Sequence, residues 1–288
     1  MELGEVGIWW SGSWSGADGT PGAAAAAVES LGYTALWSSG GFEPGFPDRF
    51  GRLLDATDHL PVASGILSIW HADPAHVAQA VTGLEAAHPG RFLLGLGASH
   101  APIVEQLGTA YASPYSRMVQ YLDQLDDHGP AVAADRRVLA ALGPRMLTLS
   151  AERAAGAHPY FVPVEHVARA RELIDPGPLL APELAVVLET DAVVARATAR
   201  EYTTGYLRLP NYANNLRSLG FGDELEEGGS DKLVDAVVAW GDASTIAERV
   251  RAFHDAGADH VCVQVVADRS KGFPLDAYRK LAPALLGG

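Results

Sequence analysis

The sequence predicts a single α/β domain over residues 1–288: a (β/α)8 TIM barrel with an insertion between strands seven and eight. In roughly the first 90 residues, four apolar runs alternate with amphipathic segments, which is the pattern of a parallel sheet covered by helices. Eight such runs occur along the chain, and the amino-acid composition does not change in a way that would indicate a second domain. The length of 288 residues also suits one barrel.

The first half of the chain gives the clearest strand–helix units. The predicted strands span residues 6–10, 33–37, 62–70 and 92–96, and helices follow at 21–31, 47–60 and 74–88. Thr20-Pro21 and Asp73-Pro74 each place an N-cap residue before a proline, which the first turn of a helix tolerates.

The second half is less regular. Its predicted strands span residues 138–142, 160–162, 184–188 and 259–266, and its predicted helices span 114–125, 144–155, 164–174, 192–206, 233–239, 244–256 and 274–286. The segment 207–232 is rich in Asn, Gly and acidic residues. Because so long a connection is unusual in a compact domain, we expect an insertion that forms either a lid or an oligomer contact, the latter giving a homodimer.

Composition limits the partners of this chain. A net charge of -14 disfavours nucleic acid and anionic membranes as partners. One cysteine, no basic leader and no apolar run of 18 residues together predict a cytoplasmic protein. A small-molecule substrate is therefore the expected partner.

The fourth predicted strand carries the strongest functional signal. Gly95 and Gly97 lack a Cβ, so another group is expected to approach the backbone there. Ser99 and His100 follow the strand at the end where α/β folds keep their chemistry. We interpret His100 as a donor to a cofactor or a general acid/base, and the alternative is a loop histidine that caps the next helix.

The other histidines are weaker candidates. His71 follows the third strand and is expected either to line the same mouth or simply to precede the N-cap Asp73. His158 precedes the predicted strand 160–162, which places it on the opposite rim as a packing residue unless a ligand lies there. His254 and His260 lie on the N-terminal side of the last predicted strand, where barrel residues serve stability rather than catalysis. The remaining histidines lie in predicted helices and are expected to be exposed: His59, His76, His88, His128 and His166.

The sequence lacks the motifs of metal-binding, serine-hydrolase and dinucleotide-binding sites. Metal-ligand spacing and Gly-x-Ser-x-Gly are absent, and Cys262 alternates within a strand as a buried, inert thiol. Gly95-Leu-Gly97 lacks the third glycine of a dinucleotide fingerprint. Tryptophans gather after the first three strands, and we expect them to form an aromatic wall for a flat ligand: Trp9, Trp10, Trp14, Trp37 and Trp70.

Gly90-Arg-Phe-Leu-Leu-Gly-Leu-Gly-Ala-Ser-His-Ala-Pro102, preceded by the block 73–81, resembles the bacterial-luciferase-like superfamily of flavin and deazaflavin oxidoreductases. Further blocks resemble its actinobacterial branch that uses coenzyme F420: 118–123, 138–144, 156–160, 209–212 and 256–261. The blocks occur in the family's order over nearly the whole chain.

The resemblance implies a deazaflavin held at the C-terminal ends of the strands. It also implies a non-prolyl cis peptide in the third strand, which falls at Gly65-Ile66 by alignment on Asp73-Pro74. The ring or its side chain would face Gly97, Ala98 and Ser99. The ribityl phosphate tail would be approached by Gly143 and the turn Ala157-His158-Pro159. Trp37 and Ser39, after the second strand, complete the implied cofactor contacts.

Two departures from the family pattern concern catalysis. Several deazaflavin relatives carry an Asp-His pair after strand two, where this chain reads Ser38-Ser39-Gly40-Gly41. A glutamate found after strand four in some relatives is missing, and His100 occupies its neighbourhood. His100, with His71 second, is therefore our candidate for the catalytic group.

Three functions follow from these observations. The leading hypothesis is an F420-dependent oxidoreductase that transfers a hydride to or from a small organic substrate, the cofactor carrying the electrons and the protein the proton. The first alternative keeps the fold and uses FMN and O2 in a monooxygenase. The second is a barrel that binds a cofactor without turnover.

Overall fold

The computed structural model describes residues 1–10, 21–40, 45–127, 129, 132–266 and 272–287. Its strands pair in parallel in the order β10-β9-β11-β1-β2-β3-β5-β6-β7-β8. β8 (Leu179–Leu180) and β9 (Glu183–Val187) are consecutive pieces of one extended segment, so the two arms of this path join. The Ala181 N–H donates to the Ala157 carbonyl (2.9 Å) and the Cys262 N–H to the Pro182 carbonyl (3.0 Å), which ties the segment to both neighbours. The sheet therefore closes into a barrel.

The barrel positions are filled in chain order. They are β1 (Val6–Trp10), β2 (Leu36–Ser38), β3 (Val62–Ser64) with β4 (Leu67–Ser68), β5 (Phe92–Gly97), β6 (Arg137–Leu139), β7 (Gly156–Ala157), β8 with β9, and β11 (Val261–Val265). An additional strand, β10 (Val238–Trp240), pairs with the C-terminal part of β9. Most of these strands are buried along their full length, as expected for a parallel sheet covered on its outer face.

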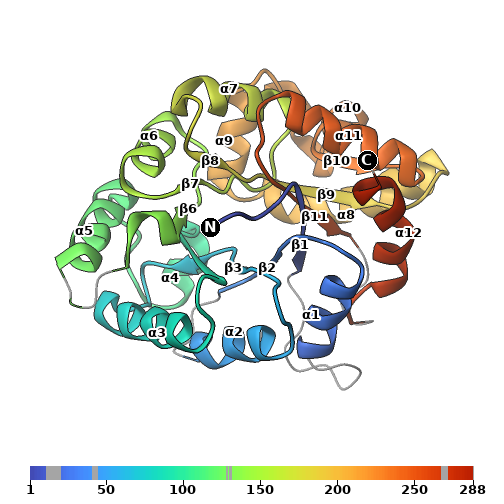
Figure 1. Ribbon diagram of the computed structural model, residues 1–288. Helices are drawn as coiled ribbons and strands as arrows, with labels where there is room; N and C mark the ends of the chain where they lie inside the picture. Colours follow the sequence, from blue (N-terminus) through green and yellow to red (C-terminus); the bar gives the residue numbers. More distant parts are fainter. Residues whose placement is uncertain (11–20, 41–44, 128, 130–131, 267–271, 288) are drawn as a thin grey trace.

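Helices surround the strands in Figure 1, with the N-terminus near the centre of the ring. The ring contains α1 (Pro21–Ser30), α2 (Phe46–Asp55), α3 (Pro74–Ala87), α5 (Pro114–Asp127), α6 (Pro144–Arg153), α7 (Val164–Ile174), α11 (Ala243–Asp255) and α12 (Leu275–Leu286). Asp73 caps α3 by accepting from the His76 N–H, as the sequence predicted. Thr20, the predicted cap of α1, lies outside the described residues.

The barrel interior is held by a buried tryptophan–histidine pair. Trp37 is fully buried, and its Nε1–H donates to His260 Nε2 at 3.0 Å. His260 Nδ1 lies 2.8 Å from the Gly4 carbonyl, which can only accept, so Nδ1 carries the proton and Nε2 is the acceptor. Cys262 is buried in the same interior cluster, and burial raises its pKa, so it is the inert thiol that the sequence indicated.

Two predicted elements are wrong in position. The sixth strand is Gly156–Ala157 rather than 160–162. Phe161 has a φ of 58°, outside strand geometry, so the Tyr-Phe-Val run turns instead of pairing. The segment 233–239, predicted as one helix, divides into α10 (Asp231–Val237) and β10.

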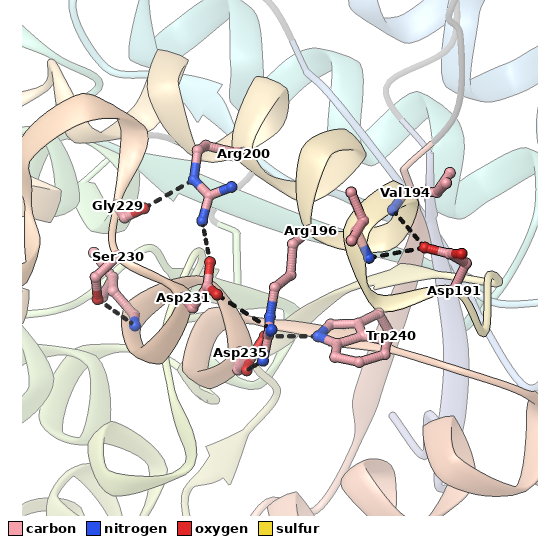
Figure 2. Close-up of polar contacts among 11 residues, drawn as sticks. Asp191, Val194, Arg196, Arg200, Gly229, Ser230, Asp231, Asp235 and Trp240 are labelled. Atoms are coloured by element: carbon pink, nitrogen blue, oxygen red, sulfur yellow. Dashed lines mark hydrogen bonds and ion pairs between the residues drawn. The ribbon is translucent and has the colours of Figure 1, made fainter.

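The predicted insertion contains regular structure. After α8 (Ala192–Leu207), the chain forms α9 (Pro210–Ser218) and two 3-10 turns before α10. Arg196 on α8 binds both oxygens of Asp235 on α10 (3.0 and 2.5 Å), and Arg200 binds Asp231 (2.5 Å). Figure 2 shows these arginines crossing from one helix to the other, with Trp240 donating to Asp235 beside them. The insertion is therefore anchored to the barrel at this end by α8. None of the helices in the described segments is long and apolar enough to span a membrane.

Candidate active site

A cavity of about 480 Å³ opens at the C-terminal ends of the barrel strands. This volume lies within the range of about 300–1,000 Å³ that is usual for small-molecule sites. Its described lining residues come from the strand ends and from the α8–α9 region: Trp9, Ser39, Gly65, Ile66, Ser68, Ala98, Ser99, His100, Ile103, Tyr111, Pro114, Ala140, Ala141, Leu142, Gly143, Met146, His158, Tyr160, Tyr206, Asn211 and Tyr212. The cavity thus has a wall of strand ends and a second wall that contains three tyrosines.

The third strand gives the strand-end wall its shape. The peptide bond between Gly65 and Ile66 is cis, which confirms the predicted position. A Cβ on Gly97 would lie 2.6 Å from Ile66 Cδ1, and one on Gly95 would lie 1.8 Å from the Ser64 carbonyl oxygen. The missing side chains of these glycines therefore make room for the third strand and for Ile66, and Ile66 faces the cavity in their place.

Two buried polar atoms at this wall have no hydrogen-bond partner among the described residues. They are Trp9 Nε1, a donor, and His158 Nε2. His158 Nδ1 lies 2.7 Å from the Ala181 carbonyl and must carry the proton, so Nε2 is an acceptor. Burial lowers the pKa of His158 to about 4, which keeps the ring neutral near pH 7. Both atoms lie around Gly65, since a Cβ placed there would be 2.5 Å from Trp9 Nε1 and 3.2 Å from His158 Nε2.

His158 is held in place by the barrel interior. Its ring stacks on Trp37 with centroids 4.3 Å apart and an interplanar angle of 15°. Trp37 is itself fixed by its bond to His260. The acceptor at Nε2 is therefore positioned by a rigid stack and one carbonyl bond, which is the organisation expected of a ligand-recognition group.

The turn after β5, the fourth strand predicted from the sequence, brings Ala98, Ser99 and His100 to the cavity. Ser99 adopts the left-handed region with φ 53°, which turns the chain sharply before α4 (Ala101–Gln106). Trp70 Nε1–H donates to the Ala98 carbonyl at 2.7 Å. His100 is the N-cap residue of α4 but makes no side-chain cap bond, because its Nδ1 binds Asn211 Oδ1 at 2.9 Å. Burial lowers the pKa of His100, and the Asn211 bond opposes that change.

The opposite wall is built from tyrosines on three elements. Tyr160 follows β7, Tyr206 lies on α8 and Tyr212 on α9. The hydroxyls of Tyr160 and Tyr206 are 2.8 Å apart, and Tyr160 also donates to Gln264 Oε1 at 2.8 Å. The ring centroids of Tyr160 and Trp9 lie 5.1 Å apart, so this wall meets the strand-end wall at Trp9.

Eight of the residues predicted for the site line this cavity: Ser39, Gly65, Ile66, Ala98, Ser99, His100, Gly143 and His158. Five others are not among its described lining residues. Trp37 lies inside the barrel under His158, and Gly97 is covered by Ile66. Ala157 and Pro159 are buried, and His71 is near the Thr109 hydroxyl (3.4 Å) instead.

The histidine predictions need three corrections, of which the first is that His88, predicted as exposed, is half-buried with its Nε2 3.1 Å from Asp55 Oδ1. His158 does not precede its strand but follows it, because the sixth strand ends at Ala157, and it therefore lies at the cavity rather than at the opposite rim. His166, predicted as exposed, is 1% exposed, and burial lowers its pKa to about 4. The helical pattern placed it correctly on α7 but did not reveal that α9 packs nearby. His128 lies outside the described residues.

The predicted tryptophan wall is mostly absent from the cavity. Only Trp9 among the described tryptophans lines it. Trp10 packs against Phe273, and Trp70 lies behind Ala98. Trp14 lies outside the described residues. The aromatic surface is supplied by tyrosines that the sequence analysis missed: Tyr111, Tyr160, Tyr206 and Tyr212.

The charge of the cavity restricts its ligands. None of its described lining residues is Asp, Glu, Lys or Arg, and burial lowers the pKa of both lining histidines. The residues fit the tricyclic ring of a flavin or deazaflavin, because the apolar side chains of Ile66 and Ala98 line the same cavity as an unpartnered donor and an unpartnered acceptor. Across the described chain, no group of three or more His, Cys, Asp or Glu side chains could hold a metal ion.

Comparisons with known proteins agree with this fold. Residues 19–127 match the family model described as luciferase-like monooxygenase. No curated protein matches the chain. An F420-dependent secondary alcohol dehydrogenase, solved with an F420-acetone adduct, superposes with a TM-score of 0.72 at 16% identity, covering 99% of both chains.

Two further solved structures differ in cofactor. The coenzyme F420-dependent tetrahydromethanopterin reductase from Methanopyrus kandleri gives a TM-score of 0.68 at 14% identity, covering 100% of this chain and 99% of its own. The oxygenating constituent of 3,6-diketocamphane monooxygenase from Pseudomonas putida, in complex with FMN, gives 0.63 at 16% identity, covering 98% and 99%. At these identities the likeness shows the fold alone, a barrel of parallel strands surrounded by helices.

Proposed function

We propose that this protein is an oxidoreductase that binds coenzyme F420 and transfers a hydride to or from a small neutral organic substrate. The proposal starts from the match of residues 19–127 to the luciferase-like family model. The observation that carries the proposal is the pair of buried, unpartnered atoms at the cavity, Trp9 Nε1 and His158 Nε2. Buried polar groups are normally hydrogen-bonded, so an unpaired donor and acceptor at one apolar wall indicate a ligand with complementary polar atoms.

The strand-end wall would hold the ring of the cofactor. Ile66 and Ala98 supply the flat apolar surface, Trp9 Nε1–H donates and His158 Nε2 accepts. When bound, the cofactor supplies two-electron hydride chemistry. The protein's part is to orient the ring and to exclude water. The N-terminus of α6 at Gly143 is suited to bind the phosphate tail of the cofactor.

The tyrosine wall would face the substrate. Tyr206 presents a hydroxyl and Asn211 an amide at the cavity, with apolar surface from Met146 and Leu142. Because no charged side chain is found among the described lining residues, an uncharged ketone or secondary alcohol fits better than a sugar phosphate or a carboxylate. His100, the proton donor expected from the sequence, lies at the same mouth.

Cofactor titration tests this function. The purified chain is titrated with F420 and, separately, with FMN, and binding is followed by quenching of cofactor fluorescence. We expect tighter binding of F420 than of FMN. His158→Leu removes the acceptor at Nε2 and should weaken F420 binding by about tenfold, or about 1.4 kcal/mol. His76→Leu, on the exposed side of α3, is the matched control.

The other outcomes are equally specific. Tighter binding of FMN would replace the F420 proposal with the FMN-dependent monooxygenase. Binding of neither cofactor would overturn both. Equal affinity of the His158→Leu and His76→Leu variants would show that the unpartnered ring nitrogen does not face the cofactor.

A further inference from the structure

We propose that Glu183 is the proton store of this cavity and that the hydroxyls of Tyr202, Tyr160 and Tyr206 connect it to the bound substrate. The inference rests on the proposed function and deepens it, because it names the group that exchanges the proton during hydride transfer. Glu183 is a barrel residue on β9, and its side chain does not line the cavity itself.

Glu183 is a carboxyl group in an unusual place. It is 1% exposed, and it is the only Asp or Glu that is buried among the described residues. Its Oε2 accepts from the Phe161 N–H at 3.2 Å, and its Oε1 lies 3.4 Å from the Tyr202 hydroxyl. No arginine or lysine of the described chain forms an ion pair with it. A buried carboxyl without a cation is stable only when it keeps its proton.

The hydroxyls continue from Glu183 to the cavity without a break. The Tyr202 hydroxyl donates to the Tyr160 hydroxyl at 3.2 Å, and the Tyr160 and Tyr206 hydroxyls are 2.8 Å apart. Tyr206 and Tyr160 both line the cavity, so the chain of hydroxyls ends at the ligand space. Gln264 Oε1 accepts from the Tyr160 hydroxyl at 2.8 Å, so this hydroxyl turns its proton from Gln264 to Tyr206 for the transfer.

The groups around Glu183 are weak acids that stay neutral. Burial raises the pKa of each of them, and their mutual repulsion as anions adds to the effect: Tyr160, Tyr202, Tyr212, Cys262 and Tyr278. Tyr206 lies beside them on α8, and His158, 4.0 Å from Cys262 Sγ, is neutral near pH 7. Burial raises the pKa of Glu183 to about 8, so it is protonated at neutral pH and still able to release a proton.

The proton balance is complete in both directions. In ketone reduction, a bound reduced deazaflavin would supply the hydride to the carbonyl carbon, and Tyr206 would give its proton to the carbonyl oxygen. In the same step Tyr160 would pass its proton to Tyr206, Tyr202 to Tyr160 and Glu183 to Tyr202, so that each tyrosine stays neutral and Glu183 becomes the carboxylate. In alcohol oxidation each transfer runs in reverse, and the Glu183 carboxylate takes up the hydroxyl proton.

Infrared spectroscopy of the protein without cofactor tests the store and the connection separately. The carbonyl stretch of a protonated carboxylic acid should be present at pH 7, should disappear as the pH rises through about 8, and should be missing in Glu183→Gln. After mixing into D2O, this band shifts as the carboxyl proton exchanges. We expect exchange to be slower by about tenfold in Tyr202→Phe, because one hydrogen bond of the route is lost.

Tyr33→Phe is the matched control, since Tyr33 is a buried tyrosine outside the cavity whose hydroxyl donates to the Tyr278 carbonyl. It should exchange like the unmodified protein. No carboxylic-acid band at pH 7, or equal exchange in Tyr202→Phe and Tyr33→Phe, would overturn the inference. Neither result depends on cofactor binding, so failure of the titration and failure of the relay are distinguishable.

Turnover gives the second readout. With reduced F420 and propanone as the probe ketone, Glu183→Gln and Tyr202→Phe should lower the single-turnover rate by about 100-fold and increase the solvent isotope effect. The KM for the ketone should stay the same, because neither residue lines the cavity. Unchanged rates in both variants, with Tyr33→Phe also unchanged, would show that the tyrosines and Glu183 are only structural.

Discussion

The two walls of the cavity are built by different means. The strand-end wall consists of residues at or directly after the ends of strands β1 to β7, and these are fixed by the hydrogen-bonded sheet. The tyrosine wall is formed largely by α8 and α9, which line the cavity and are held there by side-chain contacts. One wall is therefore set by backbone register, and the other by tertiary packing.

This difference separates two kinds of chemical role. The strand-end wall offers single, rigid polar atoms, such as His158 Nε2, against an apolar surface. The tyrosine wall offers connected hydroxyls that reach a buried carboxyl. Rigid atoms suit recognition of a flat cofactor, and connected hydroxyls suit movement of protons. The predictions below test this division, from the largest expected effect to the smallest.

Gly95→Ala should disrupt the strand-end wall most strongly. Its new Cβ would lie 1.8 Å from the Ser64 carbonyl oxygen, and neither backbone can move without breaking the register of the sheet. We expect loss of at least about 4 kcal/mol in the free energy of unfolding, measured by urea denaturation. Gly83→Ala is the matched control: it has open space in α3 and should stabilise the fold by about 0.5–1 kcal/mol. Similar stability of the two variants would show that the wall is not fixed by register.

The same contrast explains what the sequence could predict. Apolar runs and proline-opened helices revealed seven barrel strands close to their observed places, and thus His100 at the mouth. Ile66 and Ala98 were expected there from the family resemblance. Strand six was misplaced, because Tyr160 and Phe161 have the composition of a strand while β7 contains only Gly156 and Ala157.

The tyrosine wall had almost no local signal. Tyr202 and Tyr206 are spaced by four residues, so they share a face of α8, and this was the available indication. Their meeting with Tyr160 and Tyr212 depends on long-range packing, which periodicity does not encode. Glu183 reads in sequence as an ordinary polar residue beside a strand.

Tyr206→Phe and His100→Gln decide which wall supplies the proton. Removal of the Tyr206 hydroxyl breaks the route to Glu183 at the ligand, so we expect kcat for propanone reduction to fall about 100-fold. His100→Gln preserves a polar contact to Asn211 and should change kcat by less than about tenfold. Both are measured at saturating ketone. The reverse ranking would assign the proton to His100 and limit the tyrosines to shaping the cavity.

Stability as a function of pH should separate the two walls without any ligand. On the acid side, burial lowers the pKa of His158, His166 and His260 to about 4 in the folded chain. Between pH 6.5 and 4 these histidines are therefore protonated in the unfolded chain, where their pKa is about 6.5, but not in the folded chain. Stability is therefore lost as the pH falls from about 6.5 towards 4. On the alkaline side, burial raises the pKa of Glu183 from 4.5 to about 8, so the folded chain holds a proton that the unfolded chain has released. Stability is lost there as the pH rises, by about 1.4 kcal/mol per pH unit up to about pH 8.

Below pH 6.5 the three histidines outweigh Glu183, so the two effects give a maximum of stability near pH 6.5. Urea denaturation at several pH values should show this maximum, with a net loss of about 0.5 kcal/mol between pH 6.5 and 8, because the histidines of the unfolded chain still release protons over this range and offset part of the Glu183 effect. Glu183→Gln carries no titrating proton and should remove that alkaline loss while it keeps the acid one. Tyr33→Phe should keep both. An alkaline loss that persists in Glu183→Gln would mean that the carboxyl at the base of the tyrosine wall is already ionised at neutral pH, and the tyrosines would then have no proton to conduct.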